Sequence, residues 1–172
     1  PANLAFIERQ EAFFNETAYI VDMSHTFLGY ARPLNPFEVV GVNVFYFDSG
    51  WIPSTQEEGI VNEAGEAGNY KVYYFAVKGT YARNFTDKLK AGASLQYIRE
   101  DIDDMSMQGI AFNIGVNYDL GLFGIILGSS LTNVGPDIKF GGKGTEEPVD
   151  SEDSSDGTLV KVTESHPLPT AF

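Results

Sequence analysis

Residues 109–119 read GIAFNIGVNYD, and apolar and polar side chains alternate along the whole stretch. Every second position holds a large apolar or aromatic residue: Ile110, Phe112, Ile114, Val116 and Tyr118. The positions between them hold small or polar residues: Ala111, Asn113, Gly115, Asn117 and Asp119. Successive side chains of a β-strand point to opposite faces of its sheet, so this alternation predicts a strand with one apolar face.

The same period of two recurs along most of the chain. Residues 37–48 and 88–99 alternate almost as clearly as residues 109–119. Further strand candidates cover about 17–31, 70–82, 121–131 and 158–163, and polar, glycine-containing stretches separate them. The sequence therefore predicts an all-β protein with about seven strands, without long helices.

The charge balance excludes one class of partner. The 172 residues include 11 basic and 24 acidic side chains, for a formal net charge of −13. Proteins that bind nucleic acid present a basic surface to the phosphate backbone, so no nucleic-acid partner is predicted. The sequence contains no cysteine, which excludes disulfide bonds and thiolate ligands within these residues.

Residues that could carry chemistry do not form a recognised catalytic or metal-binding pattern. His25 and His166 are the two histidines, and neither belongs to an HExxH or a Ser-His-Asp arrangement. The acidic stretch 100–104 could offer oxygen ligands to a cation, but a solvated loop is the better interpretation. The sequence predicts no enzyme, no metal site and no cofactor.

Membrane insertion through strands remains compatible with the sequence. No stretch reaches the roughly 18–20 consecutive apolar residues of a membrane-spanning helix, but a membrane strand needs only about 9–11 alternating residues. The predicted connections alternate between short and long, which would place all the long ones at one end of the sheet. That asymmetry is typical of outer-membrane barrels.

These features favour an antiparallel, up-and-down transmembrane β-barrel. Bacterial barrels close with an even number of eight or more strands, and an open edge in lipid would leave backbone groups unpaired. About seven strands would therefore form part of a larger barrel. The alternative is a soluble, secreted all-β binding domain whose aromatic side chains pack in an ordinary core.

The barrel hypothesis assigns positions to two groups of residues. Polar residues opposite the apolar faces would line the lumen: Asn43, Ser94, Gln96, Asn113 and Asn117. Aromatic residues near strand ends would lie at the two membrane interfaces: Tyr19, Tyr30, Tyr46, Tyr70, Tyr81, Tyr97 and Tyr118.

Several short motifs occur in an order that resembles a known family. They are PANLA at 1–5, GTYAR at 79–83, AGAS at 91–94, NVGP at 133–136 with IKF at 138–140, and PLP at 167–169. Their order and spacing, over nearly the whole chain, resemble the PorV/PorQ family of outer-membrane proteins. This family is related to the FadL-type long-chain fatty-acid transporters.

The resemblance implies a barrel of about 14 strands, with an N-terminal segment inside the lumen. Residues 1–16 would form this hatch-like segment, and residues 17–172 would supply strands and loops of the same barrel domain. The family's opening motif reads Asn-Pro-Ala, and its Leu-Pro motif opens a further strand. The sequence is therefore expected to be a fragment truncated at both ends.

Two functions follow from the resemblance. The first is a non-enzymatic role in type IX protein secretion, in which the barrel receives exported cargo. The second is a FadL-like channel for hydrophobic compounds. Both imply a location in the bacterial outer membrane and contact with its lipid. Cargo proteins, other secretion components or a hydrophobic small molecule would be the further partners.

Overall fold

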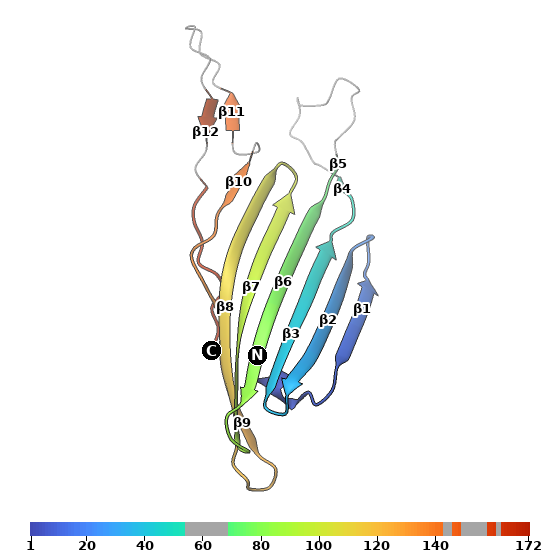
Figure 1. The fold of residues 1–172 in the computed structure, drawn as a ribbon. Helices are drawn as coiled ribbons and strands as arrows, with labels where there is room; N and C mark the ends of the chain where they lie inside the picture. Colours follow the sequence, from blue (N-terminus) through green and yellow to red (C-terminus); the bar gives the residue numbers. More distant parts are fainter. Residues whose placement is uncertain (54–68, 143–145, 149–157, 161–162) are drawn as a thin grey trace.

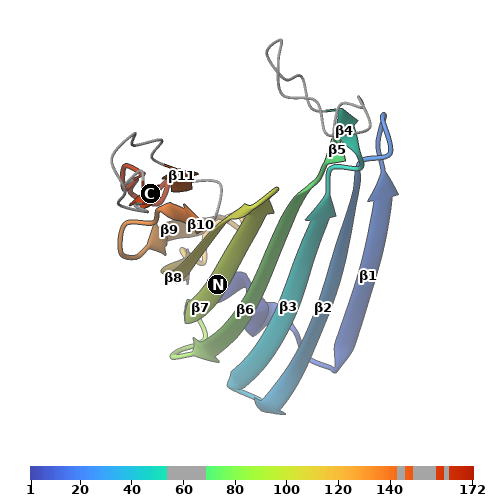
Figure 2. The same ribbon diagram turned by 90° about the horizontal axis from the view of Figure 1, so that it is seen from above.

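The computed structural model describes residues 1–53, 69–142, 146–148, 158–160 and 163–172. Most of them form one antiparallel sheet in the order β1-β2-β3-β6-β7-β8, with both β9 and β10 paired to β8 (Figure 1). The strands are β1 (Glu11–Ala18), β2 (Ser24–Asn35), β3 (Glu38–Asp48), β6 (Val72–Asn84), β7 (Leu89–Ile102), β8 (Met105–Asp119), β9 (Ile126–Val134) and β10 (Phe140–Gly142). The predicted all-β, antiparallel class is confirmed. The sheet is twisted and does not close on itself (Figure 2).

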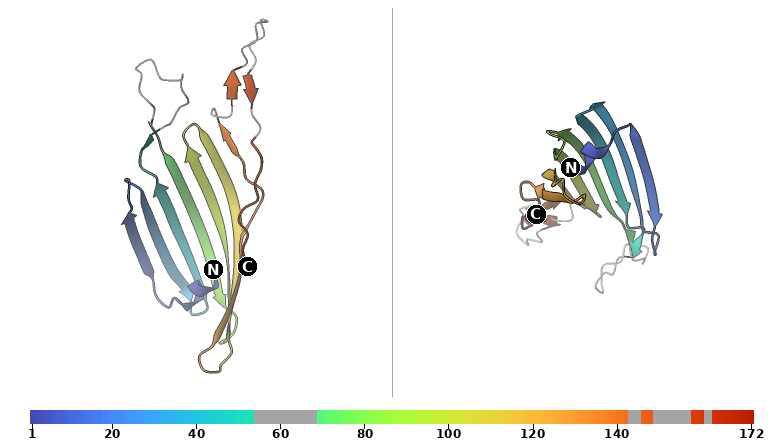
Figure 3. Two further views of the ribbon diagram at one scale, coloured as in Figure 1. Left: turned by 180° about the vertical axis from the view of Figure 1, so that it is seen from behind. Right: turned by 90° about the horizontal axis from the view of Figure 1, so that it is seen from below.

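Smaller elements flank this sheet. The 3₁₀ helix η1 (Ala2–Phe6) lies behind the strands in Figure 1 and in front of them in the left view of Figure 3. β4 (Ile52–Pro53) pairs with β5 (Asn69–Tyr70), and β11 (Glu146–Pro148) pairs with β12 (Thr158–Val160). Both short pairs lie at the upper end of the sheet in Figure 1, at the same end as the β1–β2 and β7–β8 turns.

The register joins the apolar residues of four strands on one face. Val44 pairs with Val77, Val77 with Tyr97, and Tyr97 with Ile110. The alternate apolar residues of β3, β6, β7 and β8 therefore share one face, which we call the open face. η1 and Leu168 lie on the opposite face, which we call the covered face, because Pro1 lies against Gly92 and Leu168 packs with Ile98 and Ala111.

Burial in the described residues is inverted relative to a water-soluble domain. Ten apolar residues are buried, and six of them are alanines: Ala2, Ala5, Ala31, Ala76, Ala82 and Ala111. Large apolar side chains of the open face are exposed instead, with Leu95 at 59% and Ile110 at 52%. Large exposed side chains gathered on one face form a surface that an apolar partner or environment can cover.

Small residues on the covered face permit close packing. A Cβ at Gly92 would lie 2.8 Å from the carbonyl carbon of Pro1, so only glycine lets the start of η1 approach β7 this closely. Nearer the upper end, Ile98, Ala111 and Leu168 pack against one another and are buried. The covered face therefore holds what little buried core the described residues possess.

The prediction of one strand over residues 17–31 is wrong, because this segment spans a hairpin. Val21 and Asp22 have φ angles of 58° and 57°, and the Tyr19 amide donates to the Met23 carbonyl at 2.7 Å. A left-handed backbone is unusual for a β-branched residue, so the sequence gives no sign of this turn.

The predicted hatch-like segment 1–16 is divided by the same hairpin. η1 lies on the covered face, whereas residues 11–16 belong to β1 and pair with β2. β2 also continues past the predicted turn at Pro33, where the register with β3 shifts before Asn35.

The predicted acidic loop 100–104 is a two-residue turn. β7 continues to Ile102 and β8 begins at Met105, so that only Asp103 and Asp104 connect them. Asp103 has a φ of 51°, a left-handed conformation that aspartate tolerates better than most residues.

The predicted sixth strand begins later than expected, at Ile126 rather than near residue 121. Phe123 and Gly124 have φ angles of 54° and 70°, which places both in the turn before β9. Phe123 is therefore not one of the alternating strand residues.

Three further segments differ from or exceed the predictions. The stretch after residue 133, predicted as a loop, contains β10 and β11. The predicted last strand 158–163 corresponds to β12, and residues 161–162 lie outside the described residues. Residues 54–68 of the predicted loop 49–69 also lie outside them.

The chain leaves β9 through a tight corner at 133–136. Asn133 has a φ of 59°, and a Cβ at Gly135 would collide with the carbonyl oxygen of Ile110. Only glycine lets the chain pass this close to β8.

Gly135→Ala should therefore destabilise the fold by about 1–3 kcal/mol, because the added methyl group displaces the corner from β8. The matched control is Gly79→Ala, whose Cβ would have no atom within 4 Å. Urea unfolding followed by circular dichroism measures both changes. Equal stability of the two variants would contradict the close approach at Gly135.

Candidate functional site

All of the polar residues predicted to line a lumen lie on the covered face: Asn43, Ser94, Gln96, Asn113 and Asn117. Lys78 stands between Asn43 and Gln96 in the register. Ser94, Asn113 and Asn117 are buried, and the other two are half-buried. These five residues therefore lie opposite the large apolar side chains of the same strands.

Asn113 connects the sheet to the corner at residue 133. Its Nδ2 donates to Ser94 Oγ at 3.0 Å, and its Oδ1 accepts the Asn133 amide at 2.7 Å. The register of β8 with β9 shifts between Phe112 and Ile114, which disrupts the ladder at this point. The Asn113 side chain therefore supplies the acceptor that a regular strand would have offered.

Asn133 extends this network to the C-terminal residues. Its Nδ2 donates to the Pro169 carbonyl at 3.1 Å, and Thr170 Oγ1 donates to the Asn133 carbonyl at 3.2 Å. Leu168, 6% exposed, packs on Ile98 between these polar contacts and the upper end of the sheet. The C-terminal segment is thus held by hydrogen bonds and apolar packing together.

Asn117 holds η1 in the same manner. Its Nδ2 donates to Asn3 Oδ1 at 2.7 Å. Lys90 Nζ lies 4.7 Å from the centroid of the Phe6 ring, a cation–π contact that fixes the other end of the helix. Both terminal segments are therefore attached to the covered face by specific side chains.

A hollow of about 280 Å³ lies beside η1, against β1, β2 and β3. Its lining includes Leu4, Ile7, Phe13, Phe27 and Asn43. The Phe13 and Phe27 rings are 5.9 Å apart. Such a hollow can accept an apolar molecule, with the Asn43 amide as a polar contact. Sequence reasoning missed it because β1, which supplies Phe13, was not recognised.

The tyrosines predicted at membrane interfaces fall into two groups. Five lie on the open face: Tyr30, Tyr46, Tyr81, Tyr97 and Tyr118. Tyr19 lies in the β1–β2 turn, with its ring 5.3 Å from that of His25, and Tyr70 lies in β5.

Charged side chains mark both ends of the open face on β3 and β6. At the lower end Arg83 Nη1 lies 3.5 Å from Glu38 Oε1, which also accepts the Tyr81 hydroxyl at 2.6 Å. At the upper end Lys71 Nζ lies 3.5 Å from Asp48 Oδ2. The positions of these two strands between the charged ends are uncharged on this face.

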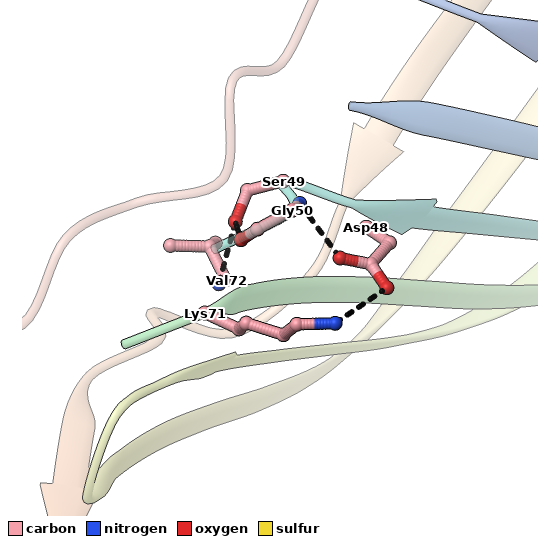
Figure 4. Close-up of polar contacts among 5 residues, drawn as sticks. All are labelled: Asp48, Ser49, Gly50, Lys71 and Val72. Atoms are coloured by element: carbon pink, nitrogen blue, oxygen red, sulfur yellow. Dashed lines mark hydrogen bonds and ion pairs between the residues drawn. The ribbon is translucent and has the colours of Figure 1, made fainter. Parts of the chain in front are cut away.

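Asp48 also organises the chain where β3 ends (Figure 4). Its Oδ1 accepts the Gly50 amide at 2.7 Å, and Gly50 has a φ of 70°. Ser49 Oγ accepts the Val72 amide at 2.9 Å and donates to the Gly50 carbonyl. Ser49 thus gives Val72 a partner at the end of the ladder.

Lys71 is held as a cation at this upper end. Desolvation acts to lower its pKa, but the Asp48 carboxylate and Tyr73 raise it, and the pKa lies above its ordinary value. The ammonium also lies 4.8 Å from the centroid of the Trp51 ring. Trp51 and Lys71 were missed as a pair because twenty residues separate them in the sequence.

The described residues contain no cluster of three or more His, Asp or Glu side chains that could hold a metal ion. Within the acidic stretch 100–104, Asp101 accepts hydrogen bonds from Arg99 at 2.7 and 2.8 Å. None of the helices among the described residues is long and apolar enough to cross a membrane. The sequence matches no protein-family model and no curated protein.

Asn113→Ala should destabilise the protein by about 2–3 kcal/mol, because it leaves the Asn133 amide and the Ser94 hydroxyl without their partners. Asn43→Ala is the matched control, since the Asn43 amide makes no hydrogen bond to a described residue. The control should change the free energy of unfolding in urea by less than about 1 kcal/mol. Similar losses in both variants would refute the bridging role of Asn113.

Proposed function

We propose that this chain forms part of the wall of an outer-membrane β-barrel of PorV/PorQ type. Its function would be a non-enzymatic role in type IX protein secretion, with exported cargo received at the barrel. The observation that carries the membrane location is the open face, whose exposed apolar side chains end at charged residues on both sides.

The height of this apolar band suits a bilayer. Ten residue steps separate Glu38 from Asp48 on β3, and at about 3.3 Å per residue they span roughly 33 Å along the strand. With a strand tilt of about 40°, the vertical distance becomes roughly 25 Å, the height of the apolar band on outer-membrane barrels.

The edges of the sheet support a larger barrel. In an apolar environment, unpaired backbone groups along β1 and β9 would each cost several kcal/mol, in the range of about 2–7. Thr132 and Ala171 already exchange backbone hydrogen bonds of 2.9 and 3.3 Å beside β9. A following strand could continue this ladder and cover the free edge of β9.

The secretion role depends on the order of the family-like motifs. Two of these motifs have clear structural roles here, since NVGP forms the corner at 133–136 and PLP buries Leu168 on the covered face. Both motifs would therefore serve the structure of a barrel wall, one at a corner and one on the covered face.

A channel for hydrophobic compounds is the second candidate. The hollow beside η1 favours it, because Phe13, Phe27 and Leu4 give the hollow an apolar lining on the face that would line the lumen. The two functions differ in what passes through or docks at the barrel, and they share the same membrane location.

The membrane location can be tested with a charge on the open face. Ile114→Arg places a cation in the middle of the apolar band, where it should cost about 2–4 kcal/mol in a bilayer and very little in water. We expect the complete protein to fractionate with the outer membrane and to shift on a gel after boiling. For the Ile114→Arg variant, we expect much less protein in the outer-membrane fraction and a much weaker heat-dependent shift on the gel.

Gln108→Arg is the control, because Gln108 lies on the same face of β8 at the upper boundary of the band. This variant should fractionate and shift like the unmodified protein. Recovery of the complete protein in the soluble fraction, with Ile114→Arg behaving normally, would instead support a soluble, secreted all-β binding domain.

Deletion of the complete gene in its source bacterium separates the two membrane functions. If the protein is a secretion component, its loss should leave exported cargo proteins in the periplasm, while uptake of a labelled long-chain fatty acid remains normal. The reverse pattern would favour the channel. Normal secretion together with normal uptake would exclude both functions.

A further inference from the structure

Two cations and a hollow coincide at the upper end of the open face. The hollow has a volume of about 430 Å³, and its lining includes Arg99, Ser106, Gln108, Lys139, Gly141 and Gly142. Arg99 and Gln108 are cross-strand partners on β7 and β8, and Lys139 is the residue that precedes β10. A Cβ at Gly141 would have no atom within 4 Å, so this part of the hollow is open.

The two cations are able to bind a further anion. Arg99 uses Nε and Nη2 for Asp101, which fixes the guanidinium, and the Tyr97 hydroxyl interacts with the same group. A guanidinium has five N–H donors, so donors remain for an anion. Lys139 forms no ion pair within the described residues. β8 lies between Arg99 on β7 and Lys139 beside β10, so the backbones of these two residues are two strand spacings apart, roughly 10 Å. Paired arginine and lysine side chains at this separation suit a phosphate group placed between them.

A second hollow lies lower on the same face, inside the apolar band. Its volume is about 440 Å³, and its lining includes Val40, Gly79, Tyr81, Ala93, Leu95 and Phe112. It exists because Gly79 and Ala93 carry little or no side chain between larger neighbours. Leu95 is four residues from Arg99 along β7, roughly 13 Å, which is within reach of an acyl chain whose headgroup lies at Arg99.

We propose that the open face binds one anionic lipid at a fixed site. Its phosphate lies between Arg99 and Lys139, and one acyl chain occupies the hollow at Gly79 and Ala93. Asp101, Asp103 and Asp104 lie at the nearby turn, and their negative charges repel an anion. The phosphate is therefore expected at Arg99 and Lys139 and not at the turn itself. The inference rests on the proposed membrane location of this face.

The test uses the complete protein in detergent and native mass spectrometry. A phosphatidylglycerol and a phosphatidylcholine with the same acyl chains are the lipid probes, and inorganic phosphate is the third. Arg99→Gln/Lys139→Gln should weaken phosphatidylglycerol binding about tenfold, the loss expected from one or two charge-assisted hydrogen bonds. Ala93→Leu fills the lower hollow and should weaken binding of both lipids.

The control is Arg32→Gln/Lys88→Gln, which removes the same charge from the lower part of the sheet and should leave lipid binding unchanged. Heat-modifiability of each variant shows that it is folded. Equal binding by the Arg99→Gln/Lys139→Gln variant and this control would overturn the proposal. Binding of inorganic phosphate with no effect of Ala93→Leu would also overturn it, in favour of a phosphate site.

The failure of the proposed function would look different from these outcomes. A complete protein that is soluble without detergent and shows no heat shift would refute the membrane location itself. A heat-shifted membrane protein whose lipid binding ignores Arg99 and Lys139 would refute the lipid site alone.

Discussion

The exposure of large apolar side chains on one face of the sheet constrains the rest of this structure. Burying apolar surface contributes about 25 cal/mol per Å², and the open face obtains almost none of this within the described residues. Within the described residues, stability comes from the backbone ladder and from the contacts of η1 and the C-terminal segment with the sheet. The open face therefore needs surroundings that accept an apolar surface, and we propose a bilayer because its thickness matches the height of the band.

The covered face is built on the opposite principle. Its side chains are small or polar, so that η1 and the C-terminal segment can approach the backbone at Gly92 and Gly135. Asn113 and Asn117 then replace the hydrogen bonds that water would have supplied. Among the described residues, no buried side-chain nitrogen or oxygen lacks a partner, which makes this face specific in its contacts although it is weak in hydrophobic burial.

The alternation in the sequence was sufficient to predict β3, β7 and β8 and the direction of their side chains, because a period of two reports the strand backbone directly. The β1–β2 turn was missed, since Val21 is a poor candidate for a left-handed conformation. The contact between Asn113 and Asn133 depends on a register shift that no local pattern contains. The charges at Glu38 and Asp48 could have been found, because they flank an uncharged alternating stretch in the sequence.

A cysteine scan along β8 tests the central claim most directly, since the sequence has no cysteine of its own. Single cysteines at positions 110–118 of the complete protein would carry a fluorescent label, in vesicles whose acyl chains are brominated. The account predicts strong quenching at the even positions, which lie on the open face, and weak quenching at the odd positions. Quenching without this period of two, or no quenching at any position, would contradict a bilayer against the open face.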